Sequence, residues 1–499
     1  MRLVRIWLVL AGVSLSALAQ MNAPEVRKLS LEDCLQGALQ KNLDLQIARY
    51  NVPLAALTLQ GSYAGWDPSF TIGAVQSYNA EPGSFNSSLG TVTLGQAAYD
   101  NAFNSSLGGL LPWGLNYTLS GNVGESFGEV GAAATPFDNS SGQALLQLRQ
   151  PLLKNFWIDQ TRMNIRVAKN RVQYSELGLK LQLMQTSTAI EDAYYDLIYD
   201  QENVTVQQKA VELAEQLVVE NKKRVEVGAM APLDEQQAEA QAAANEATLI
   251  AARSTLAIQE NTVKQLITDE YAHWANIRIE PAGTLTASRQ FFNLQDSWSK
   301  GLTQRPDLLQ AKLDVQKQGI TIKYNQNQLF PELDLLGSYG RNAGSLAEFE
   351  QSFGQIAIGT YPTYSYGVQL TLPVANIGAR AAYKSSKMTL EQLLLTLKRL
   401  EQNIMVQIDN DIKQAESSYE QVAATRTAEE YAAAALDAEQ KKLESGKSTT
   451  YTVLQMQRDL TTARGNLIQA LDTYDKALAQ LSLDEGTTLQ RLGINVEMK

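Results

Sequence analysis

The sequence predicts an α+β membrane protein. Long antiparallel helical hairpins, packed like coiled coils, are expected to form an α-barrel, and four β-strands per chain to contribute to a β-barrel. Three observations predict this fold class: an internal two-fold repeat, two long segments without proline, and short segments in which polar and apolar residues alternate. Together they account for nearly all of the 499 residues.

The chain repeats one order of motifs. Residues 35–77 align without a gap on residues 298–340. Three motifs recur in order: NLDL at 42–45 as RPDL at 305–308, LRQP at 148–151 as LTLP at 370–373, and RVEVG at 224–228 as KLESG at 442–446. Such ordered recurrence indicates one supersecondary unit used twice. We therefore expect a first repeat at 20–267, a connector at 268–297, a second repeat at 298–484 and a tail at 485–499, each repeat beginning with a helix.

The first residues have the pattern of a secretory signal peptide, expected at 1–19. Arg2 and Arg5 precede an apolar stretch, and small residues at 17 and 19 form a cleavage site. No later segment approaches the ~18 continuous apolar residues of a membrane-spanning helix. We therefore expect an exported protein that crosses any membrane by strands.

Composition excludes several classes of function. The net charge of −11 becomes −13 without Arg2 and Arg5, which argues against nucleic acid because phosphate binding depends on Lys and Arg. The single Cys34 permits no internal disulfide and is expected to be a buried small residue. His273 is the only histidine, and the sequence contains no Gly-rich phosphate loop or nucleophile elbow. We expect no enzyme activity, metal or cofactor.

Proline placement predicts the helices. All 13 prolines lie outside 152–231 and 374–499, which are rich in helix-forming residues. Helical hairpins are expected at 152–267 and 377–483, with breaks at Gly228 and Gly446. The first long helix, of roughly 70 residues, would span about 105 Å. Hairpins of this length exceed the width of a globular domain and must stack on each other or on other subunits.

Alternating segments predict four strands, at 67–79, 142–151, 331–340 and 364–373. Taken singly they fit a soluble sheet as well as a membrane barrel, and the signal peptide favours the barrel. Four strands cannot close a barrel, so several copies must contribute. Between them, residues 80–141 contain one more strand-like segment, which would extend the extracellular end or add a hairpin; the sequence leaves both open.

The ordered motifs resemble those of the TolC-type outer-membrane efflux proteins. The resemblance rests on LEDCL at 31–35 with NLDL, on RPDL, on QLFP at 328–331, and on the two glycine breaks. It implies a homotrimer in the bacterial outer membrane, in which three chains supply four strands each to a 12-stranded barrel above a periplasmic helical tunnel. The implied function is a passive exit duct of a tripartite efflux or type I secretion system, docked through a periplasmic adaptor onto an inner-membrane pump.

The same resemblance assigns roles at the hairpin tips. Docking of the adaptor is expected at Arg224, Val227, Gly228, Ala231, Leu443, Gly446, Ser448 and Thr449. The periplasmic entrance is expected at Asp234, Thr452 and Gln455. A plainer interpretation is that the glycines only cap helices and that Asp234 only complements a helix dipole. Because Thr452 and Gln455 stand where better-known members have two aspartates, the sequence leaves charge gating of the entrance open.

A competing hypothesis is a periplasmic coiled-coil scaffold or adaptor without a pore. An adaptor normally has one hairpin rather than two, and it lacks paired alternating strands. Nothing in the sequence indicates which substrate passes, or which pump and adaptor serve it.

Overall fold

The computed structural model describes residues 25–494 except 87, 89, 132 and 346–348. The signal peptide expected at 1–19 lies outside the described residues. Contacts divide the chain into two compact units. Within the described residues we call 25–46, 183–297 and 407–494 the helical unit, and 47–182 and 298–406 the sheet unit.

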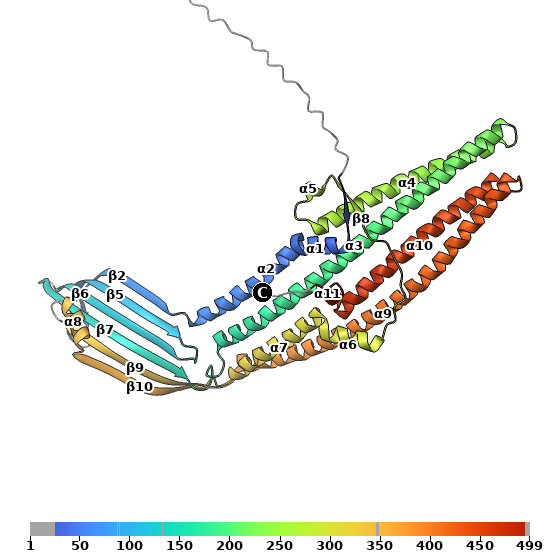
Figure 1. The fold of residues 1–499 in the computed structure, drawn as a ribbon. Helices are drawn as coiled ribbons and strands as arrows, with labels where there is room; N and C mark the ends of the chain where they lie inside the picture. The colour runs from blue at the N-terminus through green and yellow to red at the C-terminus, as the bar shows by residue number, and fades with distance from the viewer. Residues whose placement is uncertain (1–24, 87, 89, 132, 346–348, 495–499) are drawn as a thin grey trace, which may run out of the picture. The chain divides into compact units, whose positions relative to one another are not determined.

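Two helical hairpins of nearly equal dimensions dominate the helices. Helix α3 (Gln160–Glu226, 67 residues) is followed by α4 (Pro232–Ile267, 36 residues). Helix α9 (Ile377–Glu444, 68 residues) is followed by α10 (Thr450–Glu485, 36 residues). These hairpins correspond to the expected segments 152–267 and 377–483, and Figure 1 shows each return helix running beside its long partner.

The core of the helical unit is a cluster of apolar side chains from both hairpins, including Leu197, Val422 and Tyr474. Helix α1 (Leu31–Lys41) packs on this cluster and buries Cys34 to 1% exposure, as expected for a small core residue. Burial raises the pKa of the Cys34 thiol to about 12, so it stays protonated and unreactive.

The helical unit also contains several short elements. Strand β1 (Glu25–Leu29) pairs in parallel with β8 (Ile277–Pro281). Helix α5 (Tyr271–Trp274) precedes β8, and α11 (Thr488–Arg491) lies in the tail. The sequence did not predict the β1–β8 pair, because five-residue strands 252 positions apart (25 to 277) leave no local signal.

The sheet unit contains a six-stranded antiparallel sheet in the order β10-β9-β7-β6-β5-β2, drawn side by side in Figure 1. Its strands are β2 (Ser69–Glu81), β5 (Gln96–Leu110), β6 (Asn116–Val130), β7 (Thr135–Pro151), β9 (Glu332–Ser345) and β10 (Tyr361–Thr371). A separate small hairpin joins β3 (Ser84–Asn86) to β4 (Thr91–Thr93).

The expectation of four strands per chain was wrong. Strands β2, β7, β9 and β10 fall on the four expected segments, but β5 and β6 form an additional hairpin between β2 and β7. The two strands are rich in Gly, Ser and Asn, which weaken the β signal of a sequence. The strand-like segment that the sequence showed within 80–141 lies at the start of β6, so of the two interpretations left open the structure has the added hairpin. Its partner β5 is held by ladders with β2 and β6, a tertiary effect that the sequence does not display.

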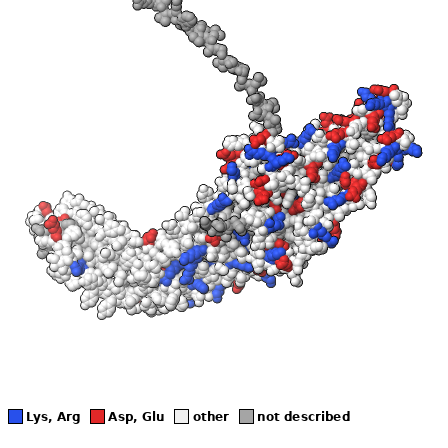
Figure 2. All heavy atoms as spheres, in the orientation of Figure 1, with Lys and Arg blue, Asp and Glu red and all other residues white. Residues whose placement is uncertain are grey.

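The sheet has two different faces. Side chains alternate along each strand, and the register places most of the large apolar ones on one face. We call this the apolar face; its most exposed members are Phe70, Ile72, Tyr78, Tyr99, Phe103, Leu119, Leu335, Tyr339, Tyr364, Tyr366, Val368 and Leu370. The opposite, polar face carries mainly Ser, Thr, Asn, Gln and Gly. On the side in view in Figure 2, charged side chains crowd the helices and are sparse over the sheet.

One helix covers part of the apolar face. Helix α8 (Phe349–Ile358) joins β9 to β10, and its Ser352 hydroxyl lies 2.6 Å from that of Ser140 on β7. The guanidinium of Arg341 donates to the carbonyls of Ile356 (3.1 Å) and Ala357 (2.8 Å) at the end of α8, where a cation complements the helix dipole.

The remaining helices of the sheet unit precede strands β2 and β9 in the chain. Helix α2 (Leu43–Ser62) and the 3-10 turn η1 (Tyr63–Trp66) lead into β2, and α6 (Leu294–Gln304) and α7 (Pro306–Asn327) lead into β9. Side-chain amides of α7 donate to carbonyls of α3 and α9, at 3.0 Å from Gln310 to Tyr174 and 2.8 Å from Gln318 to Ser386. In the described part of the chain, no helix is long and apolar enough to span a membrane.

Candidate docking and entrance site at the hairpin tips

Both hairpin tips turn in the same way. Gly228 and Gly446 have φ angles of 75° and 69°, in the left-handed region. At each tip the residue after the glycine donates its N–H five residues back, from Ala229 to Arg224 at 2.7 Å and from Lys447 to Lys442 at 2.8 Å. This is the Schellman arrangement of a helix C-terminus. A Cβ on either glycine would meet nothing within 4 Å, so backbone conformation and not packing favours glycine there.

The return helices begin differently. Pro232 occupies the first turn of α4 after Ala231, which has no side-chain cap, and Asp234 lies in the same turn. Thr449 caps α10, because its side-chain oxygen accepts the N–H of Thr452 at 3.3 Å. The role of Thr449 in this structure is thus to begin a helix; its role in docking stays a prediction.

Two polar contacts join the tips of the two hairpins. In the first contact, the Asn221 amide donates to the Thr450 hydroxyl at 3.3 Å. The same amide also donates, within its own hairpin, to the Asp234 carbonyl at 3.2 Å. The Arg224 guanidinium donates to the Leu443 carbonyl at 3.2 Å. Beneath these contacts lies a small apolar cluster of Leu217, Leu436, Leu443, Val453, Leu454 and Leu460. The tips therefore form one packed structure.

The predicted docking residues divide into surface and interior. Val227 is 78% exposed, and Gly228, Ala231, Gly446 and Thr449 are also exposed. Arg224 and Ser448 are half-buried, with the Ser448 hydroxyl bonded to the Glu439 carboxylate. Leu443 is only 4% exposed and packs in the tip cluster, so its side chain supports the tip from within.

The predicted entrance residues are all half-buried. The Thr452 hydroxyl lies 3.0 Å from that of Thr449, and the Gln455 amide donates to the Asp459 carboxylate at 2.9 Å. Sequence reasoning missed Asp459, and it missed the buried pair Asn221 and Thr450. Asp459, one turn beyond Gln455, could have been found as an i,i+4 partner of that residue.

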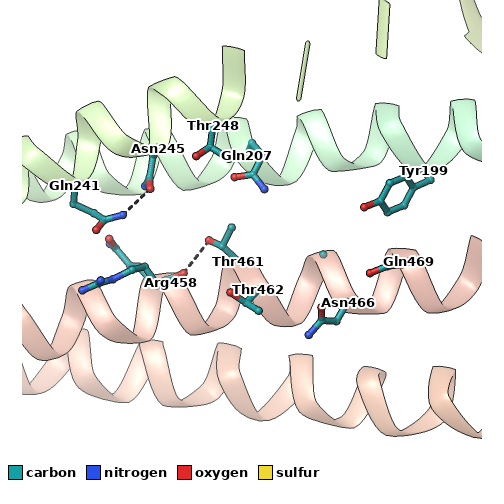
Figure 3. A pocket seen from close by; sticks show the side chains of 12 residues that line it. Tyr199, Gln207, Gln241, Asn245, Thr248, Arg458, Thr461, Thr462, Asn466 and Gln469 are labelled. Carbon is teal, nitrogen blue, oxygen red and sulfur yellow. Dashed lines mark hydrogen bonds between the residues drawn. The ribbon is translucent and has the colours of Figure 1, made fainter. Parts of the chain in front are cut away.

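A polar groove lies farther along the same hairpins (Figure 3). Its volume is about 410 Å³, and Figure 3 shows side chains of α3 and α4 facing those of α10 across it. Ten of its lining residues are labelled there: Tyr199, Gln207, Gln241, Asn245, Thr248, Arg458, Thr461, Thr462, Asn466 and Gln469. Amides and hydroxyls dominate, and among the lining residues only Arg458 is formally charged. Side chains of these types can form hydrogen bonds with a polar ligand or surface, but the lining contains no acid–base pair of the kind used in catalysis.

Buried ionisable groups tie α3 to α10 and α11. The Arg491 guanidinium donates to Glu191, which is 0% exposed, at 2.6 Å. Burial raises the pKa of Asp192 and Asp200 to about 6 and that of Asp475 to about 7. Lys476 forms ion pairs with Asp196 and Asp472. Within the described residues, no group of three or more His, Cys, Asp or Glu could hold a metal ion.

Comparison with known sequences decides the family. The profile of the family described as "Outer membrane efflux protein" matches residues 113–268 and 298–484, well over half of the chain. The chain belongs to the outer membrane efflux protein family. Membership assigns it to the outer membrane and to efflux. The interval between the two matched segments, 269–297, falls within the expected connector.

Relatives and solved structures agree with membership in this efflux family. The outer membrane efflux protein BepC of Brucella suis biovar 1 (strain 1330) is 26% identical over 361 residues, covering 72% of this chain and 75% of BepC. The Campylobacter jejuni CmeC outer membrane channel superposes with a TM-score of 0.67 at 16% identity, covering 94% and 90% of the chains. The outer membrane protein VceC of Vibrio cholerae gives 0.67 at 16%, covering 91% and 96%. The two structures show a shared fold.

Proposed function

We propose that this chain is the exit duct of a tripartite efflux or type I secretion system, in which three identical copies enclose one passage. Their sheets form a closed wall in the outer membrane, and their hairpins form a helical tunnel in the periplasm. Substrates pass passively to the exterior.

The two-faced sheet carries this proposal. Its apolar face exposes Phe70, Tyr366 and similar side chains at 68% and 86%, as a lipid-facing surface requires. Its edge strands β2 and β10 each pair on one side only in the described part of the chain. In lipid, unpaired backbone groups cost several kcal/mol each, so neighbouring copies must satisfy them.

The paired hairpins support the tunnel. Each chain brings two hairpins with arms of 67 and 36 or 68 and 36 residues, as a two-fold internal repeat implies. A ring of three chains then presents six tips of nearly equal length. Polar contacts such as that from Asn245 to the Ala210 carbonyl hold the arms of one hairpin together.

The tips are the proposed docking surface for a periplasmic adaptor, which couples the duct to an inner-membrane pump. Gly228 and Gly446 are exposed and lack side chains, so a helical hairpin of the adaptor can approach their backbones closely. Asp234, Thr452 and Gln455 lie in the first two turns of the return helices and would surround the entrance.

The test compares tip variants with a matched variant away from the tip. Arg224→Glu and Gly228→Trp should abolish export while trimers still reach the outer membrane. Arg253→Glu, the same charge reversal at an exposed position of α4, should leave export intact. Export and trimer content are measured in the same cells. Normal export by both tip variants would remove the docking role; a monomer in detergent that never conducts ions would remove the duct itself.

A further inference from the structure

The additional β5–β6 hairpin bears on the width of the proposed duct. It lies inside the sheet, with β2 paired to β5 over 13 residues and β6 to β7 over 15. No ladder joins β2 directly to β7. A wall with only four strands per chain would require breaking both ladders and forming a new one between β2 and β7.

The apolar face continues onto the additional strands through side chains such as Phe103, although Asn101 on β5 and Glu125 on β6, hydrogen-bonded to each other at 3.0 Å, also lie on it. Tyr78 on β2, Tyr99 on β5 and Phe127 on β6 form one cross-strand row, with ring centroids 4.8 and 5.4 Å apart. Aromatic rows of this kind mark the boundaries of a membrane-spanning sheet. At the other end of the strands, Trp113 in the β5–β6 turn is 59% exposed.

The distance along the strands between the aromatic row and the end that carries the β5–β6 turn fits the thickness of a bilayer. From Ser69 to Tyr78, β2 advances about 31 Å at the usual rise per residue. At a tilt of about 40° this corresponds to ~24 Å along the membrane normal, close to the ~25 Å apolar band of outer-membrane barrels. Strands β5 and β6 cover the same height in register with β2 and thus have the dimensions of wall strands.

The sheet edges fit each other. Adjacent strands all run antiparallel and the sheet has six, an even number, so β2 and β10 run in opposite directions. When identical sheets meet head to tail, β2 of one copy therefore meets β10 of the next as an antiparallel pair. Both edges lack Lys and Arg, and the single Pro362 lies at the second residue of β10, so they carry few of the features that protect soluble sheet edges.

We infer that β2 and β10 pair between copies of this chain, and that the proposed trimer has an 18-stranded wall. This inference rests on the proposed trimeric duct. Barrel diameter grows roughly in proportion to strand number, so the passage through the membrane is about 1.5 times as wide as with twelve strands. The number of hairpin tips is unchanged, which makes the helical entrance, and not the wall, the narrowest part for a bulky substrate.

Electron microscopy of the full-length protein in lipid nanodiscs tests the inference with two deletions. Removal of residues 96–130 takes out β5 and β6 as a pair and preserves the direction of β7. Removal of residues 84–93 takes out the β3–β4 hairpin, whose flanking Gly83 and Gly95 already lie side by side. We expect 18 strands for the full chain, 12 for the first deletion and 18 for the second.

The outcomes separate the two proposals. A trimer whose wall has 12 strands in the full-length protein, with β5 and β6 outside it, would overturn the inference and leave the duct intact. Particles that are not trimers would contradict the proposed assembly itself. If the variant lacking 96–130 fails to fold, the strand number of the full chain and of the variant lacking 84–93 still distinguishes a wall of 18 strands from one of 12.

Discussion

The Asn221 amide lies 3.3 Å from the Thr450 hydroxyl, and both residues are 0% exposed. One residue belongs to the first hairpin and the other to the second, 229 positions later. Because Asn221 also donates to the Asp234 carbonyl, a single side chain fixes the end of α3, the start of α4 and the start of α10. The position of the entrance residues therefore depends on this amide.

Replacement of Asn221 by Ala should loosen both tips. The change leaves the Thr450 hydroxyl and the Asp234 carbonyl without this partner in a buried site and creates a small cavity, at a cost of about 2 kcal/mol. Hydrogen exchange at residues 220–235 and 443–456 should accelerate accordingly. Gln241→Ala, which removes a half-buried amide bonded to Asn245, is the control and should change exchange little. Unaltered protection in Asn221→Ala would contradict the structural role of the amide.

Glycine-to-alanine changes should have opposite signs at a tip and within a helix. Gly228→Ala forces a Cβ into the left-handed region and should destabilise the tip by about 1 kcal/mol, whereas Gly228→Asn should cost less. Gly319→Ala, in the middle of α7 with open space around it, should stabilise by about 0.5–1 kcal/mol. Local hydrogen exchange measures both effects. Changes in stability of the same sign at the two positions would show that packing, and not backbone conformation, determines the effect of the substitution.

A rise in pH from 5 to 8 should weaken the helical unit. Burial raises the pKa of Asp475 to about 7 and those of Asp192 and Asp200 to about 6. A carboxyl with a raised folded-state pKa contributes stability below its unfolded pKa, near 4, and loses it as pH rises through the folded value. The melting temperature should therefore fall between pH 5 and pH 8.

Asp475→Asn isolates one of these groups. The neutral amide should raise the stability at pH 8 by ~2 kcal/mol, after allowance for partial solvation, and should have little effect at pH 4. Thermal unfolding of the purified protein at the two pH values measures the difference. Glu239→Gln, at an exposed position of α4, should be neutral at both. The same gain for Asp475→Asn at pH 4 would mean that the effect is not one of charge.

Removal of Arg491 should be more harmful than removal of its whole ion pair. Arg491→Met leaves the fully buried Glu191 without its cation and should destabilise by about 3 kcal/mol. The double change Glu191→Met with Arg491→Met removes the uncompensated charge and should recover much of the loss. Melting temperatures of the two variants decide, and a double variant no more stable than the single one would refute the argument.

Sequence reasoning located the helical hairpins because proline and glycine act locally. Gly228, Gly446 and Pro232 mark the turns with no information from the rest of the chain. Of the strands β5 and β6, only the start of β6 had a strand-like sequence pattern. Gly121, Gly124 and Gly128 weaken β6 as a sequence signal, and its ladders with β5 and β7 become visible only in three dimensions.

At the hairpin tips, too, local features could be predicted from the sequence and contacts between distant segments could not. The sequence predicts where Arg224 and Leu443 lie along their helices, but not that the guanidinium of one binds the carbonyl of the other. It predicts neither the burial of Leu443 nor the pairing of Asn221 with Thr450, because both depend on how two distant hairpins pack. Their roles toward an adaptor remain predictions.

An added hairpin has a consequence for how chains with this sheet can diverge. A single extra strand between β2 and β7 would reverse the direction of β7 and send α3 to the opposite side of the bilayer from α2. Two extra strands return the polypeptide to the side it left. Within the proposed assembly, pore size can therefore change only in discrete steps, six strands per ring at a time.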